Sequence, residues 1–255
     1  MKIKDILVVY HEPTKSVLTS LEKFLEKRAE CVCCERTGLD EYLFRKKNLV
    51  IVIGGDGTFL RASHFVKNEL IFGINPDPKN KEGFFTRAVK KDFAEKLEKI
   101  LEGRFRVTKL LRLEARINGK KVPVLALNEF FIGSHRAYIT LRYKLKIGKK
   151  EEEEKSSGII VSTPAGSTAW NRSAGGSLLR FDDLGRYQYV VREPYFGRVH
   201  KPKMLHGILD KDMAIKIASE GKGVLVTDSF LEYPLKENAL VEIRVSEQHL
   251  NFVDI

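Results

Sequence analysis

Long hydrophobic runs are missing from this chain of 255 residues, although 43% of its residues are hydrophobic. Its longest apolar stretches are about five residues, whereas a membrane-spanning helix needs about 20. Near the N-terminus there is neither the apolar segment of a secretory signal nor an Arg- and Ser-rich transit segment. We therefore expect a soluble, cytoplasmic protein with no membrane partner, built from one large or two moderate domains.

Cysteine is scarce, and its three copies are crowded together at Cys31, Cys33 and Cys34. At this spacing two of them could not easily bridge without strain, no Cys-x-x-Cys pair is present, and no histidine lies close by in sequence. No histidine–carboxylate spacing indicates a structural zinc site either. We predict reduced thiols in a strand and no metal site made by the protein itself.

Acidic residues are in deficit, since 45 Lys and Arg stand against 34 Asp and Glu, a net charge of +11. A basic balance suits a polyanion such as a nucleotide, a dinucleotide or nucleic acid, but it also fits a lysine-rich solvated surface. Basic clusters interleaved with aromatic residues are absent, so we expect no nucleic-acid partner. Glutamine occurs only twice, which leans towards a thermophilic source.

The order of the expected elements divides the chain. Strand and helix patterns alternate up to about residue 101, with helices expected over 14–30 and 89–101, which is typical of a parallel sheet in a layered α/β domain. Later segments are mostly strands, with Asn118-Gly119 as a tight hairpin turn and the charge run 149–155 as an exposed hairpin tip. We predict an α/β domain at 1–104, a β-rich domain at 105–235, and a segment 236–255, including a strand at 240–245, that could return to the first domain.

The most informative segment is residues 50–60, VIVIGGDGTFL. A buried strand breaks at Gly54 and Gly55 and a helix follows from Thr58. Glycine allows close approach, and a helix N-terminus attracts anions, so this pattern favours phosphate. Asp56 would repel phosphate unless it accepts a proton from a hydroxyl being phosphorylated or holds a divalent metal. The plainer alternative is a strand-to-helix turn capped by an Asp.

A second glycine-containing segment spans residues 156–176, SSGIIVSTPAGSTAWNRSAGG. Another β-branched strand meets hydroxyl residues and then a helix-like stretch, so hydroxyl and backbone donors gather at a helix start. Taken alone, this segment is equally well explained as an ordinary capped helix.

Together the motifs GGDGTFLRA, ALNEFF and VSTPAGSTAW followed by SAGG resemble the NAD kinase family. The resemblance extends from about Val50 to Val245. It implies a Rossmann-related, NAD kinase-like fold and phosphoryl transfer to the 2′-hydroxyl of the adenosine ribose of NAD, producing NADP. It also implies ATP with Mg²⁺ or another divalent cation and a homodimer or homotetramer. The identity of the donor, which could be another triphosphate or polyphosphate, and the oligomer size stay open.

The resemblance also implies roles for individual residues. Asp56 would be the general base, and the backbone of Gly54, Gly55 and Gly57 would cradle phosphates. Asn128 and Glu129 would hold the dinucleotide, because a carboxylate can accept from two ribose hydroxyls. Further binding positions are Thr58, Asn75, Phe84, Ser157, Thr168, Ala169, Trp170 (where Tyr is usual) and Ser173. Candidate cations for the donor phosphates are Lys79, Lys81, Arg87, Arg172 and Arg198.

Several segments of the chain depart from the family pattern. Ser156-Ser157-Gly158 replaces the usual Gly-Asp-Gly, so a carboxylate is missing at Ser157. Near the end, Val226-Thr227-Asp228-Ser229 replaces a common Asp-Gly pair. Three strings resemble the plant-type NADH kinase branch: Ala-Ser-His-Phe at 62–65, the Asn-Pro-Asp-Pro insertion in the longer segment 75–83, and Val-Arg-Glu-Pro at 191–194. Loss of a negative charge near a base of the bound dinucleotide changes the preference between oxidised and reduced nicotinamide. We predict that NADH is accepted as well as NAD.

Two other functions stay open at this point. One is a kinase of the GGDG superfamily that acts on a lipid or sugar, against which the Asn128-Glu129 pair and the second glycine motif argue. The other is a dinucleotide sensor without turnover. Asp56 argues against a sensor, because a pure binder gains little from a carboxylate beside phosphates.

Overall fold

The structure is a computed structural model that describes residues 3–11, 14–136 and 138–255. The chain divides into two compact units. Unit 1 comprises residues 1–109 together with 250–255, and unit 2 comprises residues 110–249. The C-terminal strand therefore belongs to the same unit as the N-terminal half of the chain.

Unit 1 is built on a sheet whose strand order is β2-β1-β3-β4-β19-β6, with β5 paired to β4. Strands β1, β2, β3, β4, β5 and β19 are joined by parallel pairings. This agrees with the predicted α/β region with a parallel sheet. The strands are β1 (Asp5–Tyr10), β2 (Glu30–Glu35), β3 (Leu49–Ile53), β4 (Leu70–Asn75), β5 (Ala88–Val89), β6 (Arg106–Leu110) and β19 (Leu250–Asp254).

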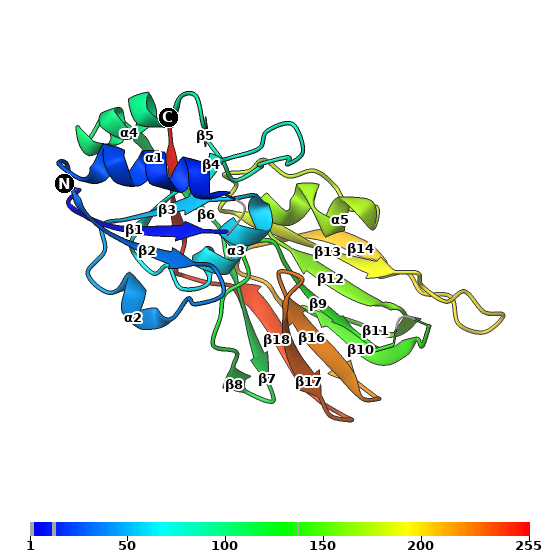
Figure 1. Cartoon of the computed structure of the whole chain (residues 1–255). Coiled ribbons are helices and arrows are strands. Elements are labelled where there is room, and N and C mark those ends of the chain that lie inside the picture. Colours follow the sequence, from blue (N-terminus) through cyan, green and yellow to red (C-terminus); the bar gives the residue numbers. More distant parts are fainter. Residues whose placement is uncertain (1–2, 12–13, 137) are drawn as a thin grey trace. The chain divides into compact units, whose positions relative to one another are not determined.

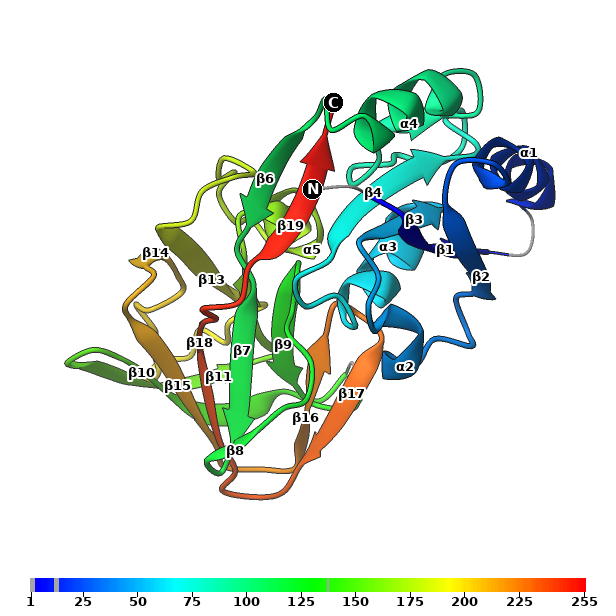
Figure 2. The ribbon, with the colours of Figure 1, turned by 90° about the vertical axis from the view of Figure 1, so that its left-hand side faces the viewer.

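Helices lie on both faces of this sheet (Figures 1 and 2). α1 (Lys15–Leu25) and α4 (Phe93–Leu101) carry apolar residues at helical spacing and pack into one core with alternate strand residues. α2 (Glu41–Phe44) and α3 (Asp56–Ser63) lie on the other side. The predicted helices at 14–30 and 89–101 are thus shorter than expected, because the chain leaves each pattern to form a strand, β2 after α1 and β5 before α4.

The C-terminal strand is β19, which Figure 2 shows between β4 and β6. Asp254 at its end binds the guanidinium groups of Arg87 and Arg106. Burial would raise the pKa of Asp254, but the hydrogen bonds from both arginines outweigh burial and hold this pKa below its usual value. The strand predicted at 240–245 is β18 (Leu240–Val245), and it pairs within unit 2.

The described residues of unit 2 form two six-stranded sheets, of order β11-β10-β15-β18-β7-β8 and β14-β13-β12-β9-β16-β17. Alternate residues of both sheets form one shared core, in which Tyr143, Tyr187 and Phe130 are fully buried. The strands are β7 (Leu113–Ile117), β8 (Lys120–Lys121), β9 (Glu129–Gly133), β10 (Leu141–Ile147), β11 (Lys150–Ser156), β12 (Gly158–Ser162), β13 (Arg186–Arg192), β14 (His206–Asp210), β15 (Ala214–Ser219), β16 (Gly223–Thr227), β17 (Leu231–Leu235) and β18.

Two local predictions in unit 2 have different outcomes. The Asn118-Gly119 turn is confirmed, since both residues have positive φ and β7 pairs antiparallel with β8. The charge run is not a hairpin tip but the strand β11. Its residues alternate between the two faces, so Glu151 and Glu153 are exposed while Glu154 is buried.

Candidate active site

The glycine turn of unit 1 joins β3 to α3. Gly55 is the N-cap of α3, so the helix begins at Asp56, two residues earlier than predicted. A side chain at Gly54 would lie 2.7 Å from Oγ1 of Thr58, so this position requires glycine, whereas a side chain at Gly57 would meet nothing within 4 Å. The turn is therefore closed on the protein side at Gly54 and open at Gly57, as an approaching ligand requires.

The Asp56 side chain is held by a neighbouring loop. Its Oδ1 accepts a hydrogen bond of 2.9 Å from the backbone N–H of Phe85. The ring of Phe85 stacks on Phe59 of α3 with 4.9 Å between ring centroids, and Phe84 packs edge-on against Phe85. Two predicted residues thus lie at the loop that follows β4: Phe84 belongs to this loop, and Asp56 of α3 is hydrogen-bonded to it.

Asn75, at the end of β4, organises that loop. Its Nδ2 donates to the carbonyl oxygen of Lys81, and its Oδ1 accepts from the N–H of Asp77. Gly83 has φ of +67°, and a side chain there would lie 2.5 Å from the Asn75 amide. The amide of Asn75 therefore shapes segment 76–83.

Two cations lie beside the glycine turn. The stem of Lys81 passes Gly55, where an added methyl group would meet Cδ of Lys81 at 3.4 Å. A guanidinium nitrogen of Arg36 lies 3.4 Å from Oγ1 of Thr58. Sequence reasoning named Lys81 but missed Arg36, whose signal is that it directly follows β2, a parallel strand with its carboxyl end at the same sheet edge. Arg87, another predicted cation, is engaged with Asp254.

In unit 2, Asn128 and Glu129 are fixed by Asp228. The carboxylate of Asp228 accepts backbone hydrogen bonds from Leu127 at 3.0 Å, Asn128 at 2.7 Å and Glu129 at 3.1 Å. In return, the N–H of Asp228 donates to the carbonyl oxygen of Glu129. From the sequence, Asp228 is noted only as a departure from the family, because its partners lie 101, 100 and 99 residues away in the chain.

The side chains of the Asn–Glu pair are buried with capacity left for hydrogen bonds. Oδ1 of Asn128 and Oε2 of Glu129 have no partner among the described residues, while Oε1 of Glu129 accepts from the hydroxyl of Ser229 at 3.3 Å. Burial, and then the charge of Asp228, raise the pKa of Glu129 to about 8. Buried polar atoms without partners are costly, so this pair is suited to a polar ligand.

The second glycine motif docks on the Asn–Glu pair. Oγ1 of Thr163 donates to the carbonyl oxygen of Leu127 at 2.6 Å and accepts from the N–H of Gly166 at 3.0 Å. A side chain on Gly166 would lie 2.2 Å from the carbonyl oxygen of Asn128, so only glycine fits. The expected helix after this motif is two short pieces, the 3₁₀ turn Ala165–Thr168 and α5 (Trp170–Ser173).

Trp170 belongs to a cluster of aromatic and cationic side chains. Its ring lies 4.9 Å from that of Phe131, and the guanidinium carbon of Arg192 lies 5.0 Å from the Trp170 ring centroid. The N–H of Ser157 donates to the carbonyl oxygen of Arg192, so Ser157 lies on the strand pairing next to this cluster. Thr168 and Ser173 are exposed and Ala169 is half-buried.

A hollow of about 380 Å³ adjoins these residues. It is lined by Phe131, Ser134, His135, Trp170, Val224, Val226, Ser229 and Glu232. Ser229 lines this hollow and also donates to Glu129, so it contacts both the hollow and the buried Asn–Glu pair.

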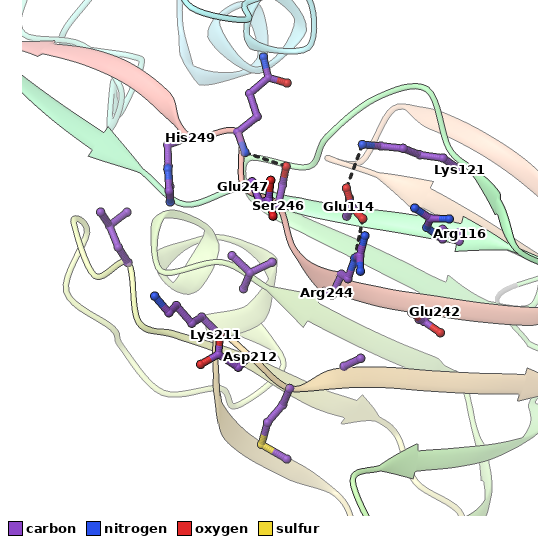
Figure 3. A pocket seen from close by; sticks show the side chains of 15 residues that line it. Glu114, Arg116, Lys121, Lys211, Asp212, Glu242, Arg244, Ser246, Glu247 and His249 are labelled. Atoms are coloured by element: carbon purple, nitrogen blue, oxygen red, sulfur yellow. Dashed lines mark hydrogen bonds and ion pairs between the residues drawn. The ribbon is translucent and has the colours of Figure 1, made fainter.

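A larger hollow of about 950 Å³ lies elsewhere in unit 2 (Figure 3). Its lining contains none of the predicted site residues. Glu114 in its wall is bound by Lys121 at 2.9 Å and by Arg244 at 2.6 Å. Its charges thus largely compensate one another, and we do not assign it as the active site.

Among the described residues, no group of three or more His, Cys, Asp or Glu side chains is arranged to hold a metal ion. The three cysteines are free, as predicted, and lie on β2; burial first of all raises the pKa of Cys33 to about 12. No helix in the described part of the chain is long and apolar enough to cross a membrane.

The fold and these motifs define a nucleotide-handling protein of two units, one with a phosphate-type glycine turn and one with a buried polar pocket. The sequence matches the ATP-NAD kinase N-terminal domain over residues 8–105 and the ATP-NAD kinase C-terminal domain over residues 127–255. The chain belongs to the NAD kinase family, and the predicted resemblance is confirmed.

Individual relatives agree with this assignment. The chain is 29% identical over 220 residues to a probable NADH kinase of Oryza sativa, covering 77% of this chain and 67% of the relative. It is 32% identical over 208 residues to an NAD kinase of Thermoplasma acidophilum, covering 81% and 73%. The similarity to a plant NADH kinase supports the predicted link to that branch.

Solved structures share the fold. An NAD kinase from Archaeoglobus fulgidus in complex with ATP has a TM-score of 0.82 at 24% identity, covering 97% of this chain and 92% of that chain. Yeast NADH kinase complexed with NADH has a TM-score of 0.86 at 15% identity, covering 100% and 84%.

Proposed function

We propose that this chain transfers a phosphoryl group from ATP to the 2′-hydroxyl of the adenosine ribose of NAD and of NADH, producing NADP and NADPH. Membership of the NAD kinase family supports the activity. The relative from Archaeoglobus fulgidus, whose structure contains ATP, supports the donor.

The observation that carries the proposal is the position of Asp56. Its carboxylate stands at the first turn of α3, behind a glycine turn, and is oriented by the N–H of Phe85. In the reaction, the 2′-hydroxyl loses its proton to Asp56 while its oxygen forms a bond to the γ-phosphorus. The bond from that phosphorus to the bridging oxygen breaks, and ADP leaves. A carboxylate held in place aids this step mainly by orientation and by taking the proton.

The dinucleotide is held, in this proposal, by the Asn–Glu pair of unit 2. Among the described residues, Oε2 of Glu129 and Oδ1 of Asn128 have no hydrogen-bond partner, and both atoms are buried. Ribose hydroxyls are donors that would satisfy both atoms, so binding removes the cost of leaving them unpaired. Because a carboxylate is the better acceptor, Glu129 would lose its proton when the dinucleotide binds.

The donor would enter as ATP with a divalent cation bound to its phosphates, so the cation comes with the substrate. Lys81 and Arg36 are the candidates for contact with these phosphates, because both lie at the glycine turn. The turn itself supplies the N–H groups at the start of α3.

Use of NADH follows, in this proposal, from Ser157. Oxidised nicotinamide is a cation and reduced nicotinamide is neutral, so a missing carboxylate removes an advantage of NAD. Arg192 near the same strand adds positive charge, although Glu193 pairs with it at 3.1 Å.

A homodimer or homotetramer stays a prediction from the resemblance, which light scattering in solution would test.

The purified chain should be incubated with ATP, Mg²⁺ and either NAD or NADH, and the products NADP and NADPH measured. Product from both supports the full proposal. Product from NAD alone keeps the NAD kinase activity and removes the argument from Ser157. Absence of product from either, with activity on a sugar or lipid, contradicts the proposal.

A further inference from the structure

Two residues with positive φ follow each other in the turn between β16 and β17. Asp228 has φ of 47° and Ser229 has φ of 65°, the left-handed region in which residues other than Gly, Asn and Asp are uncommon. Strained backbone of this kind persists where the surroundings compensate, and it concentrates at functional sites. Each of the two residues therefore calls for a structural reason.

Asp228 has such a reason in its own contacts. Its carboxylate accepts three backbone hydrogen bonds from residues 127–129, which fixes the start of β9. Asp also tolerates the left-handed region better than most residues do. The strain at this position is thus explained by the backbone that it organises.

Ser229 makes a different kind of contact. Its hydroxyl donates to Oε1 of Glu129 at 3.3 Å, and it also lines the hollow that contains Phe131 and Trp170. Glycine would adopt the same backbone conformation without strain, but it would leave both carboxyl oxygens of Glu129 without a partner among the described residues. The hydroxyl of Ser229 is therefore what this position gains over glycine.

We propose that Ser229 is a positioning residue for substrate binding: it holds Oε1 of Glu129 so that Oε2 alone faces the hydroxyl group of the bound sugar. This inference rests on the proposed function, because it takes the dinucleotide as the ligand of Glu129. Fixing one oxygen removes the rotational freedom of the carboxyl group before the ligand arrives, which strengthens binding by pre-organisation. The contact stabilises the carboxylate form, opposing the effects of burial and of Asp228.

The test compares Ser229→Gly and Ser229→Ala with the wild type. Dinucleotide binding is measured by calorimetry with NADH, stability by urea unfolding, and KM and kcat for NADH by steady-state kinetics. Asn238→Gly serves as a control, since Asn238 also has positive φ, 59°, but lies on an exposed turn.

Both Ser229 variants should bind NADH about two- to tenfold more weakly, the usual value of one hydrogen bond. KM should rise with kcat little changed, because the sugar contact is made equally in the ground and transition states. Ser229→Gly should unfold at a higher urea concentration than Ser229→Ala, since only glycine relieves the strain. Asn238→Gly should gain stability and bind NADH as the wild type does.

The pH dependence of binding gives a readout that a purely structural role would not move. Without the hydroxyl, the carboxylate of Glu129 is less stabilised, so NADH binding should require a higher pH in both Ser229 variants. Other charged or titratable groups near this point are Asp228, Arg192 beside the rings of Phe131 and Trp170, and, around the hollow, His135 and Glu232. They are unchanged in all variants.

Wild-type affinity and an unshifted pH profile in both Ser229 variants would overturn the inference while leaving the kinase proposal intact. If the wild type neither binds nor phosphorylates NAD or NADH, the proposed function fails, and this inference fails with it. If the wild type uses NAD alone, the same comparison of variants is made with NAD. Binding and turnover of the wild type distinguish the two failures.

Discussion

Oδ1 of Asp56 accepts a hydrogen bond from the backbone N–H of Phe85, and the two atoms are 2.9 Å apart. The bond ties the first turn of α3 to the loop that follows β4, so the carboxylate cannot rotate freely. Phe85 is itself anchored, because its ring is buried and stacks on Phe59. Both Asp56 and Phe59 belong to α3, so the stacking of Phe85 on this helix also fixes the N–H group that orients Asp56.

Replacement of Glu129 by Gln should flatten the dependence of stability on pH. The pKa of Glu129 is raised from 4.5 to about 8, so the protonated form of Glu129 is favoured in the folded state. The contribution of this protonated form to the free energy of unfolding is fully present below about pH 4.5. It is lost as the pH rises towards 8, which lowers the free energy of unfolding by roughly 3–5 kcal/mol. Urea unfolding of the wild type and Glu129→Gln from pH 4.5 to 8.5 measures this. A parallel loss in both proteins would contradict the expectation.

Glu154→Gln is the matched control for this experiment. Glu154 is also buried, and its burial, together with Glu152, raises its pKa from 4.5 to about 7. Its replacement should flatten the stability profile between about pH 4.5 and 7 in the same sense. Only Glu129→Gln should weaken dinucleotide binding, by about tenfold, because only Glu129 is proposed to meet the ribose.

Introduction of the missing carboxylate by Ser157→Asp should move the preference from NADH towards NAD. An added negative charge favours the cationic nicotinamide, and at a half-buried position the effect on the ratio of kcat/KM values should be about threefold to fivefold. The measurement is steady-state kinetics with both dinucleotides. Ser20→Asp, on the exposed face of α1, adds the same charge elsewhere and should leave the ratio unchanged. An unchanged ratio in Ser157→Asp would show that position 157 does not act on the nicotinamide.

Removal of the cation at the glycine turn by Lys81→Ala should raise the KM for ATP by roughly tenfold, since a hydrogen bond to a charged phosphate is lost. Dinucleotide binding should stay as in the wild type. Lys23→Ala, on the exposed face of α1, is the control and should have little effect. Equal KM values for ATP in Lys81→Ala and the wild type would exclude Lys81 from donor binding.

Much of unit 1 and its site could be predicted because the information is local. A buried strand, a glycine break and a following helix occupy consecutive residues, so residues 50–60 place Asp56 without any distant contact. The Asn118-Gly119 hairpin is predictable for the same reason, since the turn itself demands positive φ.

Long-range contacts could not be predicted in the same way. Asp228 acts on residues 127–129 across a strand pairing, and nothing near Asp228 in sequence indicates which backbone it will bind. The prediction of a hairpin tip at residues 149–155 is wrong because it rests on the local composition of the charge run. The alternation of side chains along β11, which buries Glu154, depends on pairing with other strands. Arg36 was missed since its place beside Thr58 depends on the strand order of the sheet.

The most direct test of the central claim is a comparison of Asp56→Asn with the wild type, with dinucleotide binding and turnover measured on the same preparations. Asn keeps an oxygen that can accept from Phe85 but cannot take the proton, so binding should stay within about threefold while kcat falls by about 10²–10⁴. Asp77→Asn, in the neighbouring loop, should leave both quantities close to the wild type. Turnover by Asp56→Asn near the wild-type rate would contradict the assignment of Asp56 as the base.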